Sequence, residues 1–189
     1  MLVSAQPGSH RRIYIIMLLI AAVVFSLDIW TKSLAEAAFA REGDFTEVFG
    51  WFNFTLTYNH GAAFGMLKNL PESIRKGVLL LLPPAVLLVL WRSYVSKFKP
   101  SEILGPISIG LVIGGAIGNF WDRLPDGRVT DFIDWYYRSD NGCLPQFFPI
   151  SPGTCHWPIF NLADCAIMLA MGLLIIQSLR VGKDGGISG

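Results

Sequence analysis

Two aspartates stand out because each lies beside a long apolar run. Asp131 lies in Val129-Thr130-Asp131-Phe132-Ile133, soon after one such run, and Asp164 lies near the start of the last one. Ionisable groups at a membrane boundary are costly, so by default they mark a functional site. Two carboxyl groups about 3 Å apart cannot both ionise easily, and such a pair can activate a water and protonate an amide. The sequence therefore predicts that Asp131 and Asp164 form a hydrolytic pair at one membrane face.

Other polar residues are candidates for supporting this pair. Asn161 precedes Asp164 by three positions, on the same helix face, and could donate a hydrogen bond to the pair. Asp122 and Arg123 end the preceding apolar run and could tie it to the strand that carries Asp131. A lone histidine in an outer loop, His60, is more often structural or exposed than catalytic.

Asn59 is a better candidate than its neighbour His60, because a side-chain amide can orient or polarise a peptide carbonyl without titrating. Asp28 and Lys32 are four positions apart and share a helix face. They could form an ion pair at the membrane rim, worth a few tenths of a kcal/mol if exposed. They could instead lock the first helix into a polar cluster near the site, and the sequence leaves both alternatives open.

Other chemistries fit less well. The chain has no Gly-x-Ser-x-Gly segment for a serine nucleophile, no His-Glu-x-x-His segment for zinc, and no Cys–His metal spacing, so we expect neither a metal nor a cofactor. A net charge of +1 without a basic run gives no indication of nucleic-acid binding. The main alternative is a membrane binding or transport protein that uses the two aspartates as a proton or cation site. Carriers usually place such charges near mid-membrane, within broken helices, whereas these gather toward one rim.

The composition is typical of a membrane protein. Of 189 residues, 52% are hydrophobic and only 15% are charged, and the mean hydropathy is +0.48. Four stretches are long enough, or nearly so, to cross a bilayer as helices: residues 13–30, 78–91, 103–121 and 159–179. The second must extend back through residues 73–77, and we expect Pro83-Pro84 to kink it. The first could instead be a cleaved signal peptide, because Ala35-Glu36-Ala37 and Ala38-Phe39-Ala40 resemble cleavage sites.

Glycines mark one face of the third apolar run. Gly110, Gly114 and Gly118 recur every four positions. Such small residues allow another helix backbone to approach closely. We therefore expect this helix to pack tightly against a neighbour.

The positions of lysine and arginine predict the orientation of the chain. Basic residues are concentrated in the N-terminal flank, in the connection between the second and third spans and in the C-terminal tail, at Arg11, Arg12, Arg92, Lys97, Lys99, Arg180 and Lys183. Cytoplasmic flanks carry this excess. We expect one membrane domain over residues 1–189, with a cytoplasmic leader (1–12) and tail (181–189). The long connections, about 36–76 and 122–158, would then face outward.

The first outward connection contains a strict alternation of apolar and polar residues over 52–59, which predicts a strand with one apolar face that could rest on lipid or cover a lipid-bearing ligand. Residues 67–76 are expected to form a short interfacial helix. In the second connection, Cys143 and Cys155 could form a disulfide in an oxidising compartment or remain unpaired thiols.

Five segments together resemble one family, the bacterial lipoprotein signal peptidases, also called signal peptidase II. They occur in the family's order and cover nearly the whole chain from the first span to the last: Asp28-x-x-Thr31-Lys32, Tyr58-Asn59-x-Gly61-Ala62-Ala63-Phe64-Gly65, Gly114-Gly115-Ala116-Ile117-Gly118-Asn119-Phe120-Trp121-Asp122-Arg123, Gly127-Arg128-Val129-Thr130-Asp131-Phe132-Ile133 and Trp157-Pro158-Ile159-Phe160-Asn161-Leu162-Ala163-Asp164. One such segment would be weak evidence, whereas five in order are highly specific. The chain departs from the family pattern between residues 133 and 157, where its connection is longer.

The resemblance implies an aspartic endopeptidase of the bacterial cytoplasmic membrane that works without a cofactor. Its substrate would be a prolipoprotein whose cysteine already carries a diacylglyceryl group, and it would cut just before that cysteine near the outer face. Its partners would be these precursors and membrane lipids, and it is expected to act as a monomer. The family has four membrane helices, an outward β-cradle and a short outer helix. Asp131 and Asp164 would be the catalytic pair, supported by residues that match the family's site: Asn59, Gly61, Asn119, Arg123, Asn161, Asp28 and Asp122.

Overall fold

The structure, a computed structural model, describes residues 7–61, 70–94, 103–144, 147 and 153–184. Its helices are Pro7–Ala38 (α1), Glu72–Tyr94 (α2), Leu104–Asp126 (α3) and Leu162–Asp184 (α4). Its strands are Phe45–Phe49 (β1), Phe52–Asn59 (β2), Val129–Arg138 (β3) and Thr154–His156 (β4). Each predicted span therefore lies largely within one observed helix.

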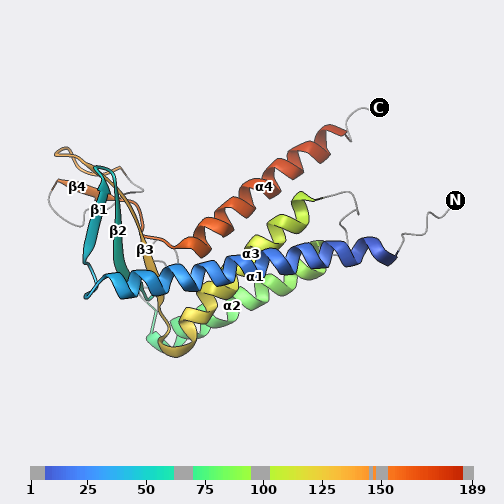
Figure 1. The fold of residues 1–189 in the computed structure, drawn as a ribbon, viewed down its shortest axis with the longest axis horizontal. Helices are drawn as coiled ribbons and strands as arrows, with labels where there is room; N and C mark the ends of the chain where they lie inside the picture. The colour runs from blue at the N-terminus through green and yellow to red at the C-terminus, as the bar shows by residue number, and fades with distance from the viewer. Residues whose placement is uncertain (1–6, 62–69, 95–102, 145–146, 148–152, 185–189) are drawn as a thin grey trace.

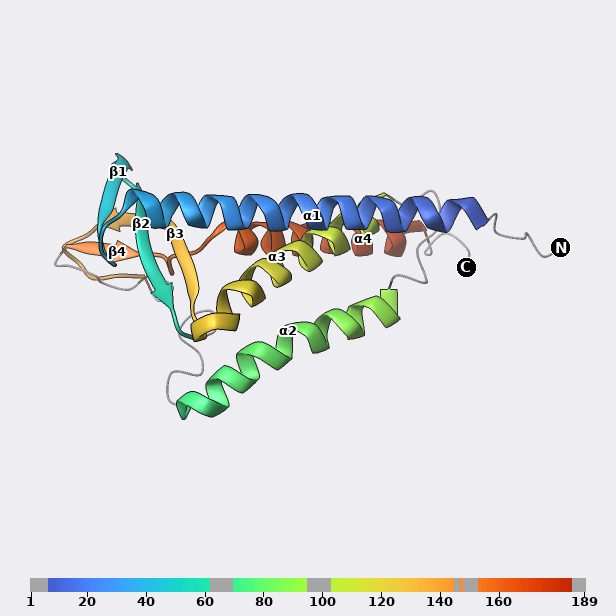
Figure 2. The ribbon, with the colours of Figure 1, turned by 60° about the horizontal axis from the view of Figure 1, so that its bottom comes forward.

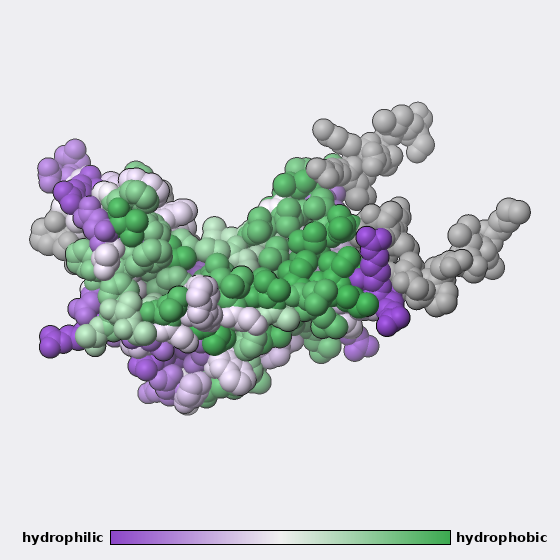
Figure 3. All heavy atoms as spheres, viewed as in Figure 1, coloured by the Kyte–Doolittle hydropathy of each residue, from purple (hydrophilic) through white to green (hydrophobic). Residues whose placement is uncertain are grey.

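All four helices are long and apolar enough to cross a membrane. The sheet lies at one end of the helices, whereas α1 begins and α4 ends at the opposite end (Figures 1 and 2). A band of hydrophobic residues covers the helices, and hydrophilic residues gather beyond both ends of this band (Figure 3). A bilayer would enclose this band and leave the sheet at one of its surfaces.

Helix α3 packs against both α1 and α4 through its glycines. A side chain at Gly114 would place its Cβ 2.7 Å from the carbonyl oxygen of Ala21 in α1. A side chain at Gly115 would place its Cβ 2.6 Å from the carbonyl oxygen of Ala163 in α4. Both distances are too short for a real Cβ, so glycine is required for these close approaches. The predicted tight packing of the glycine face is confirmed, and α1 is its neighbour.

The strands form one antiparallel sheet in the order β1-β2-β3-β4. The predicted strand over residues 52–59 is confirmed, and a bulge interrupts its pairing with β3 between Phe54 and Thr57. The polar residues Asn53 and Thr55 are buried, whereas Phe54 is 42% exposed. The bulge places Thr55 and Leu56, which are consecutive, both in buried positions. The sheet therefore encloses polar side chains and leaves Phe54 partly exposed.

Two further predictions concern helix boundaries. Helix α2 continues through Pro83 and Pro84. Of the short helix predicted over residues 67–76, residues 67–69 lie outside the described part of the chain, and residues 72–76 form the first turns of α2. Helix α3 continues to Asp126 and ends at Gly127, whose φ of +75° is the left-handed conformation that glycine adopts most easily.

The connection between β3 and β4 is closed by a disulfide between Cys143 and Cys155. This bond selects the first of the two alternatives that the sequence left open. Cys155 lies within β4, whose partner β3 also carries Asp131. The disulfide therefore holds a strand that leads directly into the start of α4 and Asp164.

Candidate active site

Asp131 and Asp164 line one cavity of about 390 Å³ between the sheet and the helices. Asp131 lies on β3 and is 2% exposed, and Asp164 lies in the first turn of α4. The cavity is also lined by three of the predicted polar residues, Asn59, Asn119 and Arg123. Segments more than thirty positions apart in the sequence thus bring two carboxyl groups to one enclosed space.

The carboxylate of Asp131 accepts hydrogen bonds from two side-chain amides. Asn161 Nδ2 donates to its Oδ1 at 2.7 Å, and Asn59 Nδ2 donates to its Oδ2 at 3.0 Å. Asn59 is placed at the end of β2, where it pairs with Val129 beside Asp131. Because each oxygen has its own donor, the orientation of the Asp131 carboxyl is determined from two sides.

Asp164 is positioned by the cap of its own helix. Asn161 Oδ1 accepts the backbone N–H of Asp164 at 3.0 Å, and Asp164 Oδ2 accepts the backbone N–H of Asn161 at 3.3 Å. This reciprocal arrangement is a capping box, in which two otherwise unpaired donors at a helix start are satisfied. Asn119 Nδ2 donates to the other oxygen, Oδ1, at 2.8 Å. Asn161 therefore caps α4 and also bonds Asp131, so one side chain sets the geometry of both acids.

The environment of Asp131 favours a protonated carboxyl. Burial, and after it the negative charge of Asp164, raise the pKa of Asp131 from its ordinary value of 3.8 to about 7. The hydrogen bonds from Asn59 and Asn161 and the positive charge of Lys32 act against this shift of the pKa, but are weaker. A pair of acids with one proton between them is the arrangement that general acid–base hydrolysis requires.

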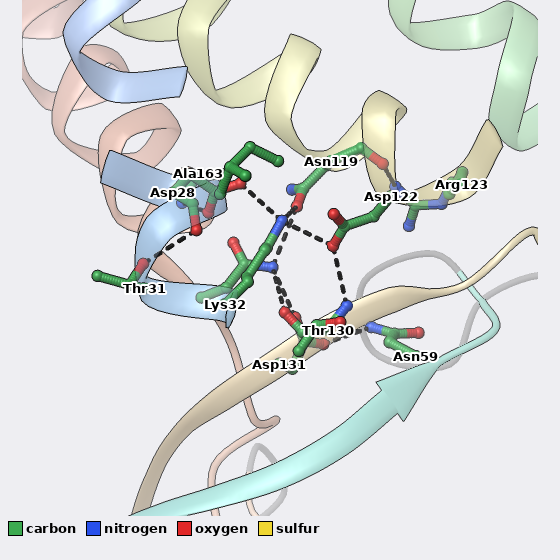
Figure 4. A network of polar contacts seen from close by, with 12 residues as sticks. Asp28, Thr31, Lys32, Asn59, Asn119, Asp122, Arg123, Thr130, Asp131 and Ala163 are labelled. Carbon is green, nitrogen blue, oxygen red and sulfur yellow. Dashed lines mark hydrogen bonds and ion pairs between the residues drawn. The ribbon is translucent and has the colours of Figure 1, made fainter. Parts of the chain in front are cut away.

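Lys32 is the cation at the centre of the polar cluster beside the pair (Figure 4). Its Nζ lies 2.7 Å from Asp28 Oδ2 and 2.9 Å from Asp122 Oδ2, and donates to Asn119 Oδ1 at 3.1 Å. The side chains of Lys32 and Asp28 are only 4% and 0% exposed. The predicted pair of Asp28 and Lys32 is therefore part of a buried cluster, and the alternative of an exposed pair at the rim is wrong.

Asp28 and Asp122 connect the cluster to the elements that carry the catalytic candidates. Asp28 Oδ1 accepts the backbone N–H of Ala163 at 2.9 Å, one residue before Asp164. Asp122 Oδ2 accepts the backbone N–H of Thr130 at 3.1 Å, one residue before Asp131. Each supporting acid thus holds the main chain next to one member of the pair (Figure 4).

Arg123 and Gly61 form the last contact among the predicted residues. The Arg123 guanidinium donates to the backbone carbonyl of Gly61 at 3.1 Å, and Gly61 N–H donates to Asn59 Oδ1 at 2.9 Å. Arg123 therefore fixes the turn that follows Asn59, as well as lining the cavity. His60, in the same turn, is exposed and is not among the residues that line the cavity.

Two groups of site residues escaped the sequence analysis. Thr130 Oγ1 donates to Glu36 Oε1 at 2.9 Å and so ties β3 to α1, and its position directly before Asp131 was the available signal. The apolar wall of the cavity comes from the segment before α4 and from one face of α4, including Trp157, Ile167, Met168 and Met171. The spacing of Ile167, Met168 and Met171 is that of a helix face, but lipid-facing and cavity-facing residues look alike in sequence.

Known proteins resemble this chain in sequence over most of its length. The family model described as signal peptidase (SPase) II matches residues 20–180. A lipoprotein signal peptidase of Aquifex aeolicus is 38% identical over 158 residues, which cover 84% of this chain and 82% of that protein. One from Francisella tularensis subsp. novicida is 34% identical, covering 87% of this chain and 92% of that protein.

Solved structures of bacterial membrane enzymes share the fold. One superposes with a TM-score of 0.71 at 27% identity, covering 92% of this chain and 93% of the other. A second gives a TM-score of 0.65 at 29% identity, with 87% and 92% covered. With a family model that matches most of its length, its four apolar helices and two aspartates that line one cavity, this chain belongs to the signal peptidase II family.

Proposed function

We propose that Asp131 and Asp164 hydrolyse the peptide bond that precedes a lipid-modified cysteine in prolipoproteins. As a member of its family the chain is a peptidase, and the relatives reported above are lipoprotein signal peptidases. The observation that carries the assignment is that two carboxyl groups from separate elements line one cavity, each oriented by side-chain amides.

The two acids have different environments, which suits them to different roles. Asp131 is the more deeply buried, and its pKa of about 7 favours it as the carboxyl that holds the shared proton. Asp164, in its ionised form, takes a proton from a water as that water attacks the scissile carbonyl. Asp131 donates its proton to the carbonyl oxygen, which gives a gem-diol. As the C–N bond breaks, the proton held by Asp164 passes to the leaving nitrogen, and one hydroxyl of the gem-diol returns a proton to Asp131. The water supplies both the hydroxyl of the new carboxyl group and the proton that the amine retains.

The shape of the cavity supports a lipid-bearing substrate. Met168 and Met171 of α4 line the cavity and are 62% and 57% exposed, so they connect the site with the lipid-facing surface of the helix. Flexible methionines pack against chains of varied shape. A diacylglyceryl group attached to a cysteine can lie along this wall while its peptide reaches the two acids.

The orientation of the molecule follows from the same arrangement. We place both termini in the cytoplasm and the sheet outside. The start of α1 and the end of α4 lie on the side away from the sheet, and the basic residues of the chain flank these two ends (Figure 1). The disulfide on the sheet side suits an oxidising compartment. Since one chain supplies both acids and the polar residues that hold them, we propose that the monomer is the active form.

The decisive experiment compares cleavage of a diacylglyceryl-modified precursor by the wild type and by Asp131→Asn and Asp164→Asn. Each variant should lose at least about a thousandfold in kcat, because removing a residue of a unit that acts together costs most of the catalysis. Asp126→Asn, which changes an exposed acid paired with Arg128, is the matched control and should retain activity. Normal cleavage by a folded variant that lacks both acids would refute the assignment.

A further inference from the structure

A second cavity, of about 330 Å³, lies against the sheet, and neither Asp131 nor Asp164 lines it. Side chains from all four strands line it, and they include both apolar residues, such as Phe45, and polar residues, such as Asn53, Asp134 and His156. Its volume is within the range of about 300–1,000 Å³ that is typical of ligand sites. The chemistry assigned to Asp131 and Asp164 uses none of these side chains.

A buried cluster of three polar side chains forms the wall of this cavity. His156 Nδ1 lies 2.8 Å from Asp134 Oδ1, and Asn53 Nδ2 donates to Asp134 Oδ2 at 2.9 Å. The three residues are between 3% and 7% exposed. Because β2, β3 and β4 each contribute one member, the cluster holds a defined geometry across the sheet.

One acceptor of this cluster is left over. Asn53 Oδ1 is buried and has no hydrogen-bond partner among the residues that the structure describes. A buried acceptor without a partner is costly, so its place in a residue that lines the cavity points to a donor from outside the chain. An amide N–H or a hydroxyl group would satisfy it.

The second cavity adjoins the cavity of the two acids. Ile159 lines both. The segment that carries it is held on β3 by main-chain hydrogen bonds from Trp157 to Trp135 at 2.8 Å and from Phe160 to Ile133 at 3.1 Å. A polypeptide whose scissile bond lies at Asp131 and Asp164 can therefore continue past Ile159 along the sheet, away from the helices.

We propose that this second cavity binds the residues on the carboxyl side of the scissile bond, and that it takes short polar side chains. This inference rests on the proposed function. The N–H or O–H of the bound segment donates to Asn53 Oδ1, and the paired Asp134 and His156 hold that amide in place. The wall with Asn53, Asp134 and His156 offers hydrogen-bond partners to a peptide, whereas α4 offers acyl chains Met168 and Met171 in the other cavity.

Kinetics with two precursors test this assignment. Both carry the same signal peptide and lipidated cysteine; one ends a single residue later, and the other continues with about six Ser, Gly and Asn residues. We expect the wild type to have a lower KM for the longer precursor. Asn53→Leu should raise that KM about three- to tenfold, as for one lost hydrogen bond, with kcat and the shorter precursor unaffected. Thr46→Val, an exposed threonine on the same sheet outside the cavity, should change neither.

Equal KM values for the two precursors in the wild type would overturn the proposal, as would an equal loss for both in a folded Asn53→Leu variant. Cleavage of both precursors would still leave the peptidase assignment intact. Cleavage of neither would overturn both proposals, because the second depends on the first.

Photocrosslinking provides a measurement that does not depend on the stability of Asn53→Leu. The longer precursor, with a benzophenone side chain two or three residues after the cysteine, is bound to the inactive Asp164→Asn variant and irradiated. We expect adducts on peptides that contain Asn53–Thr57 or Asp134–Arg138. Adducts confined to α4 would overturn the proposal.

Discussion

At the scale of single residues, Asn161 contacts both aspartates of the site. Asn161 caps α4, accepts the N–H of Asp164 and donates to Asp131 and to the carbonyl of Thr130. All of these bonds depend on the start of α4 lying beside β3. The separation of the two acids is therefore set by a helix cap rather than by long flexible side chains.

The raised pKa of Asp131 predicts a dependence of stability on pH. Between the ordinary value of 3.8 and about 7, the native state holds a proton that the unfolded chain has lost, so stability falls as pH rises through this window. The full penalty, present above pH 7, is up to about 4 kcal/mol at 1.36 kcal/mol per pKa unit. Asp131→Asn, which cannot ionise, removes it.

The measurement is the melting temperature of detergent-solubilised protein at pH 5 and pH 8. The stability of Asp131→Asn relative to the wild type should be greater at pH 8 than at pH 5. Asp140→Asn, which changes an exposed acid in the turn after β3, should show no such difference. A relative stability that is the same at both pH values would contradict a raised pKa.

Two lysines that share the same local pattern show how burial changes the value of an ion pair. Lys32 and Lys76 each follow an acid by four positions, but the Lys32 and Asp28 side chains are 4% and 0% exposed, against 43% and 68% for Lys76 and Glu72. Lys32→Met leaves the buried Asp28 and the partly buried Asp122 without their cation and should cost about 3–5 kcal/mol. Lys76→Met, at an exposed pair, should change the stability much less.

Unfolding of the two lysine variants in the same detergent compares these values directly. Because Lys32 also bonds Asn119, which holds Asp164, Lys32→Met should lower activity together with stability. Equal stability of the two variants would mean that the cluster does not depend on its cation.

At the scale of elements, α3 determines how near α1 and α4 come to the two acids. A side chain at Gly118 would overlap the carboxylate of Asp28 in α1, and one at Gly115 would meet the main chain of α4. Asn119 and Asp122 follow directly, so the same helix that allows the close approach carries polar groups into the cluster. Packing and catalytic geometry are therefore coupled in this helix.

Gly118→Ala tests this coupling. The added methyl group should displace Asp28 and lower stability by about 1–3 kcal/mol, the usual cost of overpacking. Gly172→Ala, in α4, has no neighbouring atom within 4 Å of its new Cβ and should be nearly neutral. The measurement is the melting temperature of each variant, which should be lower for Gly118→Ala than for Gly172→Ala. Similar values would contradict a tight contact at Gly118.

At the scale of the whole molecule, four helices hold a small sheet at one end of a hydrophobic band (Figures 1 and 3). The two acids lie where the sheet meets the helices, at the edge of this band. In the proposed function, water reaches this edge from the sheet side and the lipid-anchored substrate reaches it along α4. The location thus suits a reaction that joins a membrane-bound substrate with water.

The proposed orientation predicts the behaviour of reporter fusions. A green fluorescent protein attached after Gly189 should fluoresce, because it would remain in the cytoplasm. An alkaline phosphatase inserted between Asn141 and Gly142, in the exposed turn after β3, should be active, because it would be exported. The opposite pattern would reverse the orientation.

Sequence alone predicted the helices, the central strand and a set of candidate site residues. These features follow from local patterns: long apolar runs, period-two alternation over residues 52–59 and glycines every four positions. Such patterns depend only on residues near one another in the sequence, so they can be seen without the fold. The resemblance of ordered motifs then named Asp131, Asp164 and their supporting residues, which the structure brings together.

Only the tertiary structure decided how these residues act on one another. Whether Asp28 and Lys32 were exposed or buried, whether Cys143 met Cys155, and which face of β2 was enclosed all depended on contacts between distant segments. The pKa of Asp131 and the cavity beside Asn53 depend in the same way on what surrounds them. Burial and nearby charges depend on which distant segments pack around a residue. The chemistry of these side chains is therefore set only when the chain has folded.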